Sequence, residues 1–191
     1  AQLRAGGLLI YPTETSYAIG CDATNANAVR SILRLKGRER GKPLPLIVAS
    51  RTMAERYARF TPIARRFARR YWPGPLTIVA ASSKLQAPSH RLATGIIAPN
   101  HTVALRVSSH PIARALSRSL GRPIVSTSAN RAGAPSCYSA RAALRSLGFR
   151  QEHARSLSVL DLGPLPRRRP STIVDARGDR LIVLRQGSIR V

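Results

Sequence analysis

The sequence has few of the residues on which many catalytic and metal sites depend. Its 191 residues include 8 Asp and Glu, 4 His and 2 Cys. The carboxylates are dispersed, so they do not predict an acid–base pair. Cys and His do not occur at zinc-ligand spacing, and two cysteines do not predict a disulfide framework, so we interpret both as ordinary thiols. These scattered residues are His90, His101, His110, His153, Cys21 and Cys137.

Long apolar runs and familiar phosphate-binding motifs are also missing. The most apolar runs, residues 76–81 and 182–184, are far below the roughly 20 residues that a membrane-spanning helix needs. No basic-then-apolar leader opens the sequence, so we expect a cytoplasmic protein with no membrane partner. Neither a Walker loop nor a GxGxxG motif occurs. Aromatic residues make up 5%, too few for a platform that stacks single-stranded nucleic acid.

Positive charge is the most unusual feature that is present. The chain has 32 basic residues and a formal net charge of +24. Such an excess favours a polyanionic partner, either nucleic acid or a phosphorylated ligand. A solvated, arginine-rich surface without a partner explains it equally well. The hydrophobic content of 43% fits one domain, residues 1–191, with a buried core.

Lysine is rare and clustered. Only Lys36, Lys42 and Lys84 occur, and two of them lie in the segment from Lys36 to Pro43, which also carries Arg38, Arg40 and two glycines. Glycine lets a backbone approach a ligand closely, and a lysine point charge beside an arginine fork suits a triphosphate. The alternative is a solvated helix end, where cations complement the helix dipole.

Short β-rich runs alternate with amphipathic helices, which predicts an α/β fold with a mixed sheet. Residues 82–100 and 163–170 are polar or proline-rich, so we expect surface loops there. Gly37, Ser50 and Pro62 are typical of helix boundaries. Strands are expected at residues 8–11, 46–49, 76–81, 103–107, 124–127, 158–162, 172–175 and 180–184, and helices at 27–36, 50–57, 61–72, 111–120 and 139–147.

Hydroxyl-rich turns follow several of these strands and are candidates for ligand binding. Three hydroxyls lie in the turn after residues 8–11, and Ser126, Ser128 and Asn130 follow a later strand. Arg106 shares one face of an extended run with Thr102, and a partly buried arginine needs an anionic partner. Taken alone, the turn after residues 8–11 is better explained as an ordinary polar turn, and the same alternative applies to residues 126–130.

In this order and spacing, the segments resemble the threonylcarbamoyl-AMP synthase family of the YrdC/Sua5/TsaC type. The resemblance runs from Gly7 to Ile189 and is carried by the ordered set, not by a single motif. The matching segments are Pro12-Thr-Glu-Thr15, Lys36-Gly-Arg38, Pro73-Gly-Pro-Leu-Thr77, Thr102-Val-Ala-Leu-Arg106, Ser128-Ala-Asn130, Ser171-Thr-Ile-Val-Asp175 and Arg185-Gln-Gly-Ser-Ile189.

The resemblance implies a YrdC/RibB-like fold, an open twisted mixed sheet with flanking helices, in the short single-domain form. It also implies a role for each matched residue. Catalysis would depend on Lys36, Arg38, Ser128 and Asn130. ATP would contact Lys36, Arg38, Lys42, Thr102, Asn130 and Arg185, and threonine would contact Thr15, Arg106, Ser128 and Ser171.

The implied reaction joins L-threonine, bicarbonate and ATP into threonylcarbamoyl-AMP and pyrophosphate, for threonylcarbamoyladenosine modification of tRNA. ATP is a substrate, and Mg²⁺ would be held by its phosphates and not by protein side chains. A separate threonylcarbamoyl transferase would take the product. The basic surface could also bind tRNA or double-stranded RNA. Two alternatives stay open: a non-catalytic basic RNA-binding domain, and a carbamoyl-transfer domain of the same fold.

Overall fold

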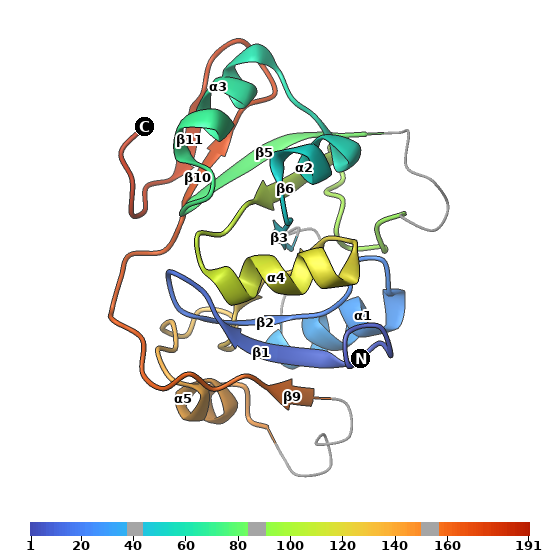
Figure 1. Cartoon of the computed structure of the whole chain (residues 1–191), viewed down its shortest axis with the longest axis vertical. Helices are drawn as coiled ribbons and strands as arrows, with labels where there is room; N and C mark the ends of the chain where they lie inside the picture. Colours follow the sequence, from blue (N-terminus) through green and yellow to red (C-terminus); the bar gives the residue numbers. More distant parts are fainter. Residues whose placement is uncertain (38–43, 84–90, 150–156) are drawn as a thin grey trace.

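The computed structural model describes residues 1–37, 44–83, 91–149 and 157–191 of the chain. Its strands form two mixed sheets, which lie one above the other in Figure 1. The smaller sheet has the order β8-β2-β1-β9, with β1 antiparallel to β2 and parallel to β9. Its strands are β1 (Leu8–Pro12), β2 (Tyr17–Gly20), β8 (Thr127–Ser128) and β9 (Leu157–Val159).

The larger sheet has the order β11-β10-β5-β6-β3-β7, and β4 also pairs with β5. Parallel pairs (β10 with β5, β3 with β6) alternate with antiparallel ones. β5 lies inside the sheet, whereas β11 is an edge strand with all four residues exposed. The strands are β3 (Leu46–Ile47), β4 (Ala58–Arg59), β5 (Leu76–Ser82), β6 (Thr102–Arg106), β7 (Ile124–Val125), β10 (Thr172–Asp175) and β11 (Ile182–Arg185).

The helix boundaries follow from local capping chemistry. Asn25, Ser50, Thr61 and Ser139 each accept a backbone N–H of the first turn of the following helix. α1 ends at Gly37, whose φ of 59° is left-handed and therefore favours glycine. The helices are α1 (Ala26–Lys36), α2 (Arg51–Tyr57), α3 (Pro62–Tyr71), α4 (Pro111–Leu120) and α5 (Ala140–Ser146). Within the described residues, no helix combines the length and the apolarity that crossing a membrane requires.

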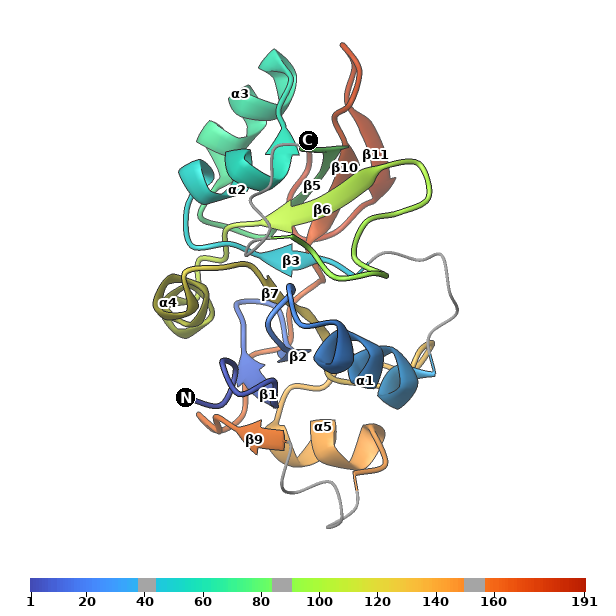
Figure 2. The same cartoon turned by 90° about the vertical axis from the view of Figure 1, so that its right-hand side faces the viewer.

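The chain passes from one sheet to the other at Ser126. β7 pairs with β3 in the larger sheet, and β8, two residues later, pairs with β2 in the smaller one. α4 packs against both β1 and β3, so it joins the two sheets from one side (Figure 2). This crossing brings the polar turn after β7 to the boundary between the sheets.

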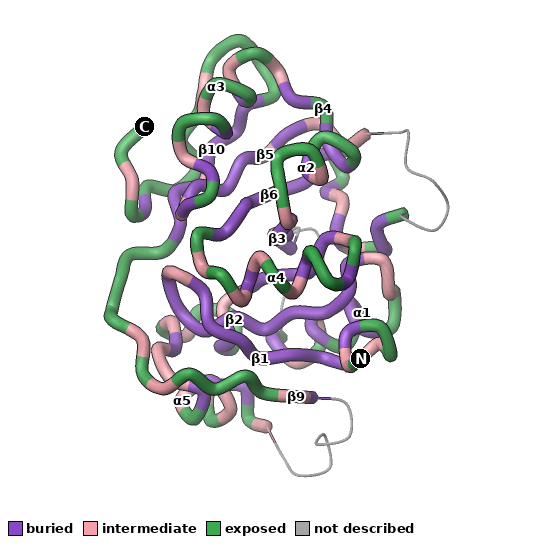
Figure 3. Tube along the Cα trace, in the orientation of Figure 1, coloured by how far each residue is buried: buried purple, intermediate pink, exposed green. Residues whose placement is uncertain are grey.

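The apolar core follows the inner strands of both sheets; β1, β2, β5 and β6 are among the most continuously buried parts of the trace in Figure 3. Tyr11, Tyr17, Ile78 and Leu105 are fully buried or nearly so. Gly20 has room for a hydrogen only, because an added Cβ would lie 2.1 Å from the carbonyl oxygen of Val125. The sheets therefore form a closely packed frame for the side chains at their boundary.

The α/β class with mixed sheets is confirmed, and the expected helices are found. The strands are divided between two sheets, however, and β2 and β4 were not expected. The prediction of a surface loop over residues 82–100 is wrong for its second half: Leu92 and Ile96 are buried in the core. These few apolar residues lie in a mostly polar segment, so the sequence pattern did not indicate that they are buried.

Candidate functional site

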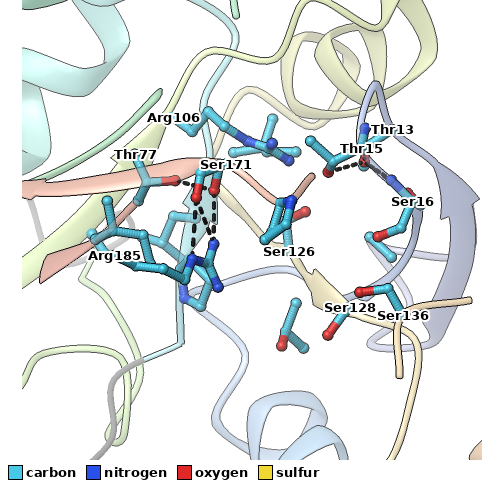
Figure 4. Close-up of a pocket in the computed structure, with 18 of the residues that line it drawn as sticks. Thr13, Thr15, Ser16, Thr77, Arg106, Ser126, Ser128, Ser136, Ser171 and Arg185 are labelled. Atoms are coloured by element: carbon cyan, nitrogen blue, oxygen red, sulfur yellow. Dashed lines mark hydrogen bonds between the residues drawn. The ribbon is translucent and has the colours of Figure 1, made fainter. Parts of the chain in front are cut away.

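A cavity of about 400 Å³ opens at the boundary between the sheets (Figure 4), within the range of small-molecule sites. Both sheets contribute to its wall. Nine of the lining residues carry a hydroxyl, and none of those in the described part of the chain carries a carboxylate. The polar lining consists of Thr13, Thr15, Ser16, Thr77, Arg106, Ser126, Thr127, Ser128, Ser136, Ser171 and Arg185.

The β1–β2 hairpin turn contributes hydroxyls whose directions are fixed by the turn itself. Thr13 Oγ1 donates to the Ser16 carbonyl at 2.7 Å and accepts the backbone N–H groups of Thr15 and Ser16. The hydroxyls of Thr13 and Thr15 are 3.1 Å apart. Since Thr13 has given its one hydrogen to Ser16, Thr15 is the donor in this pair. The remaining lone pairs of Thr15 are then available as acceptors for a ligand.

Arg106, at the end of β6, is one of two cations among the described residues that line the cavity. Behind it, Nη1 lies 3.4 Å from Glu14 Oε1, in a pair whose side chains are 9% and 8% exposed. Ser108 donates a short hydrogen bond to the other Glu14 oxygen. The nearby His110 is packed so that burial lowers its pKa, while the charge of Glu14 acts in the opposite direction. Glu14 thus faces away from the cavity and partly balances Arg106 from behind.

Arg185, at the end of β11, is the second cation, and its contacts are of a different kind. Its Nε and Nη2 donate to the Ser171 carbonyl at 3.1 and 2.8 Å, and Nη2 donates to Ser171 Oγ at 3.1 Å. Ser171 Oγ lies 3.0 Å from Thr77 Oγ1. Partial burial, and then the charge of Arg106, lower the pKa of Arg185. Two cations that repel each other across one cavity favour an anionic ligand.

The turn after β8 is held from behind by Lys36, the last residue of α1. Lys36 is 3% exposed, and its Nζ donates to the carbonyls of Ser128 and Asn130 at 2.5 and 2.7 Å. Asn130 Nδ2 donates to the Ala134 carbonyl, while Oδ1 has no hydrogen-bond partner among the described residues. Ser128 lines the cavity. Lys36 therefore holds the polar turn in shape by binding the backbone carbonyls of that turn.

Five of the residues expected from the sequence meet at the cavity: Thr15, Arg106, Ser128, Ser171 and Arg185. Lys36 and Asn130 are buried behind its wall and are not lining residues. Thr102 is four residues from Arg106, on the same face of β6, where it donates to Asn100 Oδ1 at 2.7 Å. Arg38 and Lys42 lie outside the described residues.

Thr77 and Ser136 line the cavity but were not among the expected site residues. Thr77 follows a proline-rich turn and shares one face of β5 with Val79, which also lines the cavity. This alternation was visible, but it did not show which face would be polar. Among residues 1–37, 44–83, 91–149 and 157–191, no three His, Cys, Asp or Glu residues are grouped as a metal site requires.

Comparison with protein families gives a match over almost the whole chain. The family model Sua5_yciO_yrdC, described as "Telomere recombination", matches residues 1–187. A protein of Thiobacillus denitrificans named threonylcarbamoyl-AMP synthase is 40% identical over 189 residues, which cover 95% of this chain and 91% of that one.

Solved structures are similar in the same way. P. abyssi Sua5 complexed with L-threonine has a TM-score of 0.84 and 34% identity, covering 97% of this chain and 52% of that one. The chain thus spans about half the length of P. abyssi Sua5. T. kodakarensis HypF has a TM-score of 0.77, with 97% of this chain covered and 23% of that one. Its identity of 18% shows a shared fold alone.

Proposed function

The chain belongs to the Sua5/YciO/YrdC family, and from this premise we propose that it is an L-threonylcarbamoyladenylate synthase. It makes threonylcarbamoyl-AMP and pyrophosphate from L-threonine, bicarbonate and ATP, for threonylcarbamoyladenosine modification of tRNA. In class it is a nucleotidyltransferase, acting as one domain over residues 1–191 in the cytoplasm. The relative from T. denitrificans is named threonylcarbamoyl-AMP synthase. The structure of P. abyssi Sua5 has been solved in complex with L-threonine.

One observation supports this proposal most directly: two arginines face a hydroxyl-lined cavity without a lining carboxylate in the described chain. Threonine presents a carboxylate, an amine and a hydroxyl, and ATP presents a triphosphate. Arg106 and Arg185 suit the anionic groups, and hydroxyls can both donate to and accept from the others. A site for a cationic or apolar substrate would be lined differently.

The reaction needs no covalent enzyme intermediate. The threonine amine attacks carbon dioxide formed from bicarbonate and loses a proton, which gives a carbamate. A carbamate oxygen then bonds to the α-phosphorus of ATP, and the bond from that phosphorus to the pyrophosphate oxygen breaks. Negative charge spreads over the phosphoryl oxygens in the transition state, so catalysis depends on positioning and on fixed positive charge.

We assign the residues as follows. Arg106 binds the threonine carboxylate, Thr15 and Ser171 lie beside the amino acid, and Ser128 lies between the two substrates. Arg185 and Thr102 contact the nucleotide. Lys36, Arg38, Lys42 and Asn130 complete the ATP side, with Lys36, Arg38, Ser128 and Asn130 as the catalytic group. The buried Lys36 contributes by fixing the turn that carries Ser128 and Asn130.

The lining does not fit a metal ion held by the protein, because Mg²⁺ prefers carboxylate oxygens and the described wall has none. In our proposal Mg²⁺ arrives with the ATP phosphates, and no step depends on a protein-held metal. The product passes to a separate threonylcarbamoyl transferase.

The carbamoyl-transfer domain of the same fold stays the alternative enzyme class. A synthase uses free threonine, bicarbonate and ATP, whereas a carbamoyl-transfer domain uses carbamoyl phosphate. The decisive experiment is mass spectrometry of reactions that contain ATP, L-threonine and bicarbonate, with each substrate omitted in turn. Threonylcarbamoyl-AMP that forms only in the complete mixture supports the proposal. Turnover of carbamoyl phosphate with ATP in the absence of threonine would contradict it.

A second candidate function, RNA binding, is favoured by the charge of α3. Arg65, Arg66, Arg69 and Arg70 are all exposed on this helix, away from the cavity (Figure 1). Helix α2, its neighbour, adds exposed Arg51 and Arg56; the exposed acidic residues nearby are Glu55 on α2 and Asp179, which lines a hollow together with Arg66. An arginine-rich face of this kind suits the phosphate backbone of tRNA or double-stranded RNA.

A further inference from the structure

Arg185 reaches the cavity from an exposed strand, so its orientation needs a cause. β11 is an edge strand, and an arginine side chain there is free to adopt many rotamers, at a cost in entropy when one is selected. All three of its hydrogen bonds in the described structure are to Ser171. Within the described residues it has no ion pair with a carboxylate. Ser171 therefore determines where this guanidinium points.

Ser171 is itself held by Thr77. The two hydroxyl oxygens are 3.0 Å apart, and the residues are 7% and 2% exposed. Arginine is only a donor, so Ser171 Oγ must accept from Arg185. The hydroxyl of Thr77 then fixes the rotation of the Ser171 side chain, as the dashed lines in Figure 4 trace.

Thr77 is well placed to act as the fixed end of this chain of contacts. It lies on β5, which is paired on both sides, by β10 and by β6. Thr77 pairs with Ile173 in β10, and Ile173 pairs in turn with Arg185 in β11. One row across three strands thus connects the interior of the sheet to its exposed edge.

We propose that Thr77 is a positioning residue, which acts through Ser171 to hold the Arg185 guanidinium toward the anionic part of the nucleotide. This inference rests on the proposed function, because it takes ATP as the ligand. It adds a residue to which the family resemblance assigned no role. Thr77 lines the cavity itself, so direct contact with a substrate is the competing explanation, and the experiment must separate the two.

The test compares Thr77→Val, which keeps the shape and removes the hydroxyl, with Thr77→Ser, which keeps the hydroxyl. The KM for ATP and the Kd for ATP from calorimetric titration are measured for each. We expect Thr77→Val to raise both by about three- to tenfold, the range of one neutral hydrogen bond, with little change in kcat. Thr77→Ser should restore values near those of the unaltered protein.

The route through Arg185 is tested by a double-mutant cycle. In an Arg185→Met background, adding Thr77→Val should change the Kd for ATP no further, because the group that it positions is gone. An equal loss in both backgrounds would overturn the inference and assign Thr77 to direct contact or to folding. An unchanged Kd in Thr77→Val alone would also overturn it.

Two serine variants distinguish the positioning role from a general folding defect. Ser171→Ala removes the intermediate hydroxyl and should weaken ATP binding as Thr77→Val does. Ser117→Ala also removes a fully buried hydroxyl, which donates to the Arg122 carbonyl at 2.9 Å, but lies on α4 and does not line the cavity. It should lower the melting temperature without changing the Kd for ATP. If the unaltered protein makes no threonylcarbamoyl-AMP, the proposed function fails. If it does and Thr77→Val binds ATP normally, only the positioning role fails.

Discussion

Oε1 of Glu14 lies 3.4 Å from Nη1 of Arg106, in an ion pair whose side chains are 8% and 9% exposed. The pair of Glu55 and Arg65 has the same separation of 3.4 Å, but its side chains are 49% and 51% exposed. The separation is therefore equal and the exposure to solvent different; Arg65 Nε also donates a hydrogen bond to Glu55, whereas Glu14 Oε1 has no hydrogen-bond partner among the described residues. The two pairs form an internal comparison of what burial does to an ion pair in this fold.

Glu14→Gln should destabilise the protein strongly, because it leaves Arg106 as a buried cation without its opposite charge. We expect a loss of about 3 kcal/mol in the free energy of unfolding. Glu55→Gln, the matched control, should cost about 0–1 kcal/mol. Denaturant unfolding measures both. L-Threonine should stabilise Glu14→Gln more than the unaltered protein, because its carboxylate supplies the missing charge. Equal losses in the two variants would show that Arg106 does not depend on Glu14.

Lys36→Met should lower both stability and turnover. The substitution keeps the length of the side chain but removes charge-assisted hydrogen bonds to the Ser128 and Asn130 carbonyls, worth about 1.5–3 kcal/mol each. The turn that they hold should then lose its fixed shape. Arg38→Ala should weaken ATP binding about tenfold or more, by loss of one such contact. Isothermal titration with ATP, beside a pyrophosphate-release assay, measures these effects. Wild-type values in either variant would remove that residue from the ATP site.

Valine should be rejected as a substrate in place of threonine. It has nearly the same shape but lacks the hydroxyl, so polar groups such as Thr15 Oγ1 would be left unpaired. Sites that hydrogen-bond a substrate hydroxyl discriminate on the order of 10⁴-fold in kcat/KM. Pyrophosphate release is measured with each amino acid at saturating ATP and bicarbonate. Comparable rates would show that the cavity does not recognise the hydroxyl.

Reversal of Arg65, Arg66, Arg69 and Arg70 to Glu should abolish tRNA retention at low salt and leave adenylate synthesis nearly intact. Binding through phosphates releases counterions, so the affinity of the unaltered protein should fall steeply with salt. The matched control reverses four exposed arginines of other helices, Arg30, Arg118, Arg141 and Arg145, and changes the net charge equally. If both variants lose tRNA alike, net charge and not the α3 face is responsible. Negligible affinity of the unaltered protein even at low salt would leave the arginines as a solvated surface.

Both cysteine thiols should be unreactive in the folded protein. Cys21 and Cys137 are free and buried, and burial raises the pKa of each thiol, with Lys36 acting in the opposite direction on Cys137. A raised pKa means less thiolate, the reactive form, at any pH below it. Titration with an aromatic disulfide at pH 8 should therefore detect thiol only after guanidinium is added. Rapid reaction of the native protein would show that one thiol is accessible.

Local chemistry predicted the elements better than their arrangement. Gly37, Ser50 and Pro62 mark helix boundaries because capping depends on neighbours in sequence. The strand expected at residues 124–127 was instead split between two sheets at Ser126, since pairing partners are remote and no local pattern specifies them. Leu92 and Ile96 were missed for a similar reason: a short apolar pattern without secondary structure does not show that it is buried.

The candidate site was predicted where the family resemblance supplied residues and was incomplete elsewhere. Arg106 and Arg185 were expected to bind anions, and both line the cavity. The role of Thr77 could not be predicted, because it depends on Ser171, 94 residues away. Lys36 was expected at a helix end as a ligand of the ATP phosphates, and that role stays a prediction; its contacts with carbonyls 92 and 94 residues away could not be predicted, because they depend on the fold.

The lining of the cavity begins at Thr13 and ends at Arg185, six residues before the last residue of the sequence. β11, which carries Arg185, lies at the edge of the larger sheet and pairs with β10 there. A chain cleaved within β11 therefore keeps most of the core but loses the Arg185 side of the ligand cavity. Nucleotide affinity should therefore fall when the pairing of β10 with β11 is disrupted. Proteolysis at the exposed β11 should abolish ATP binding before the protein unfolds.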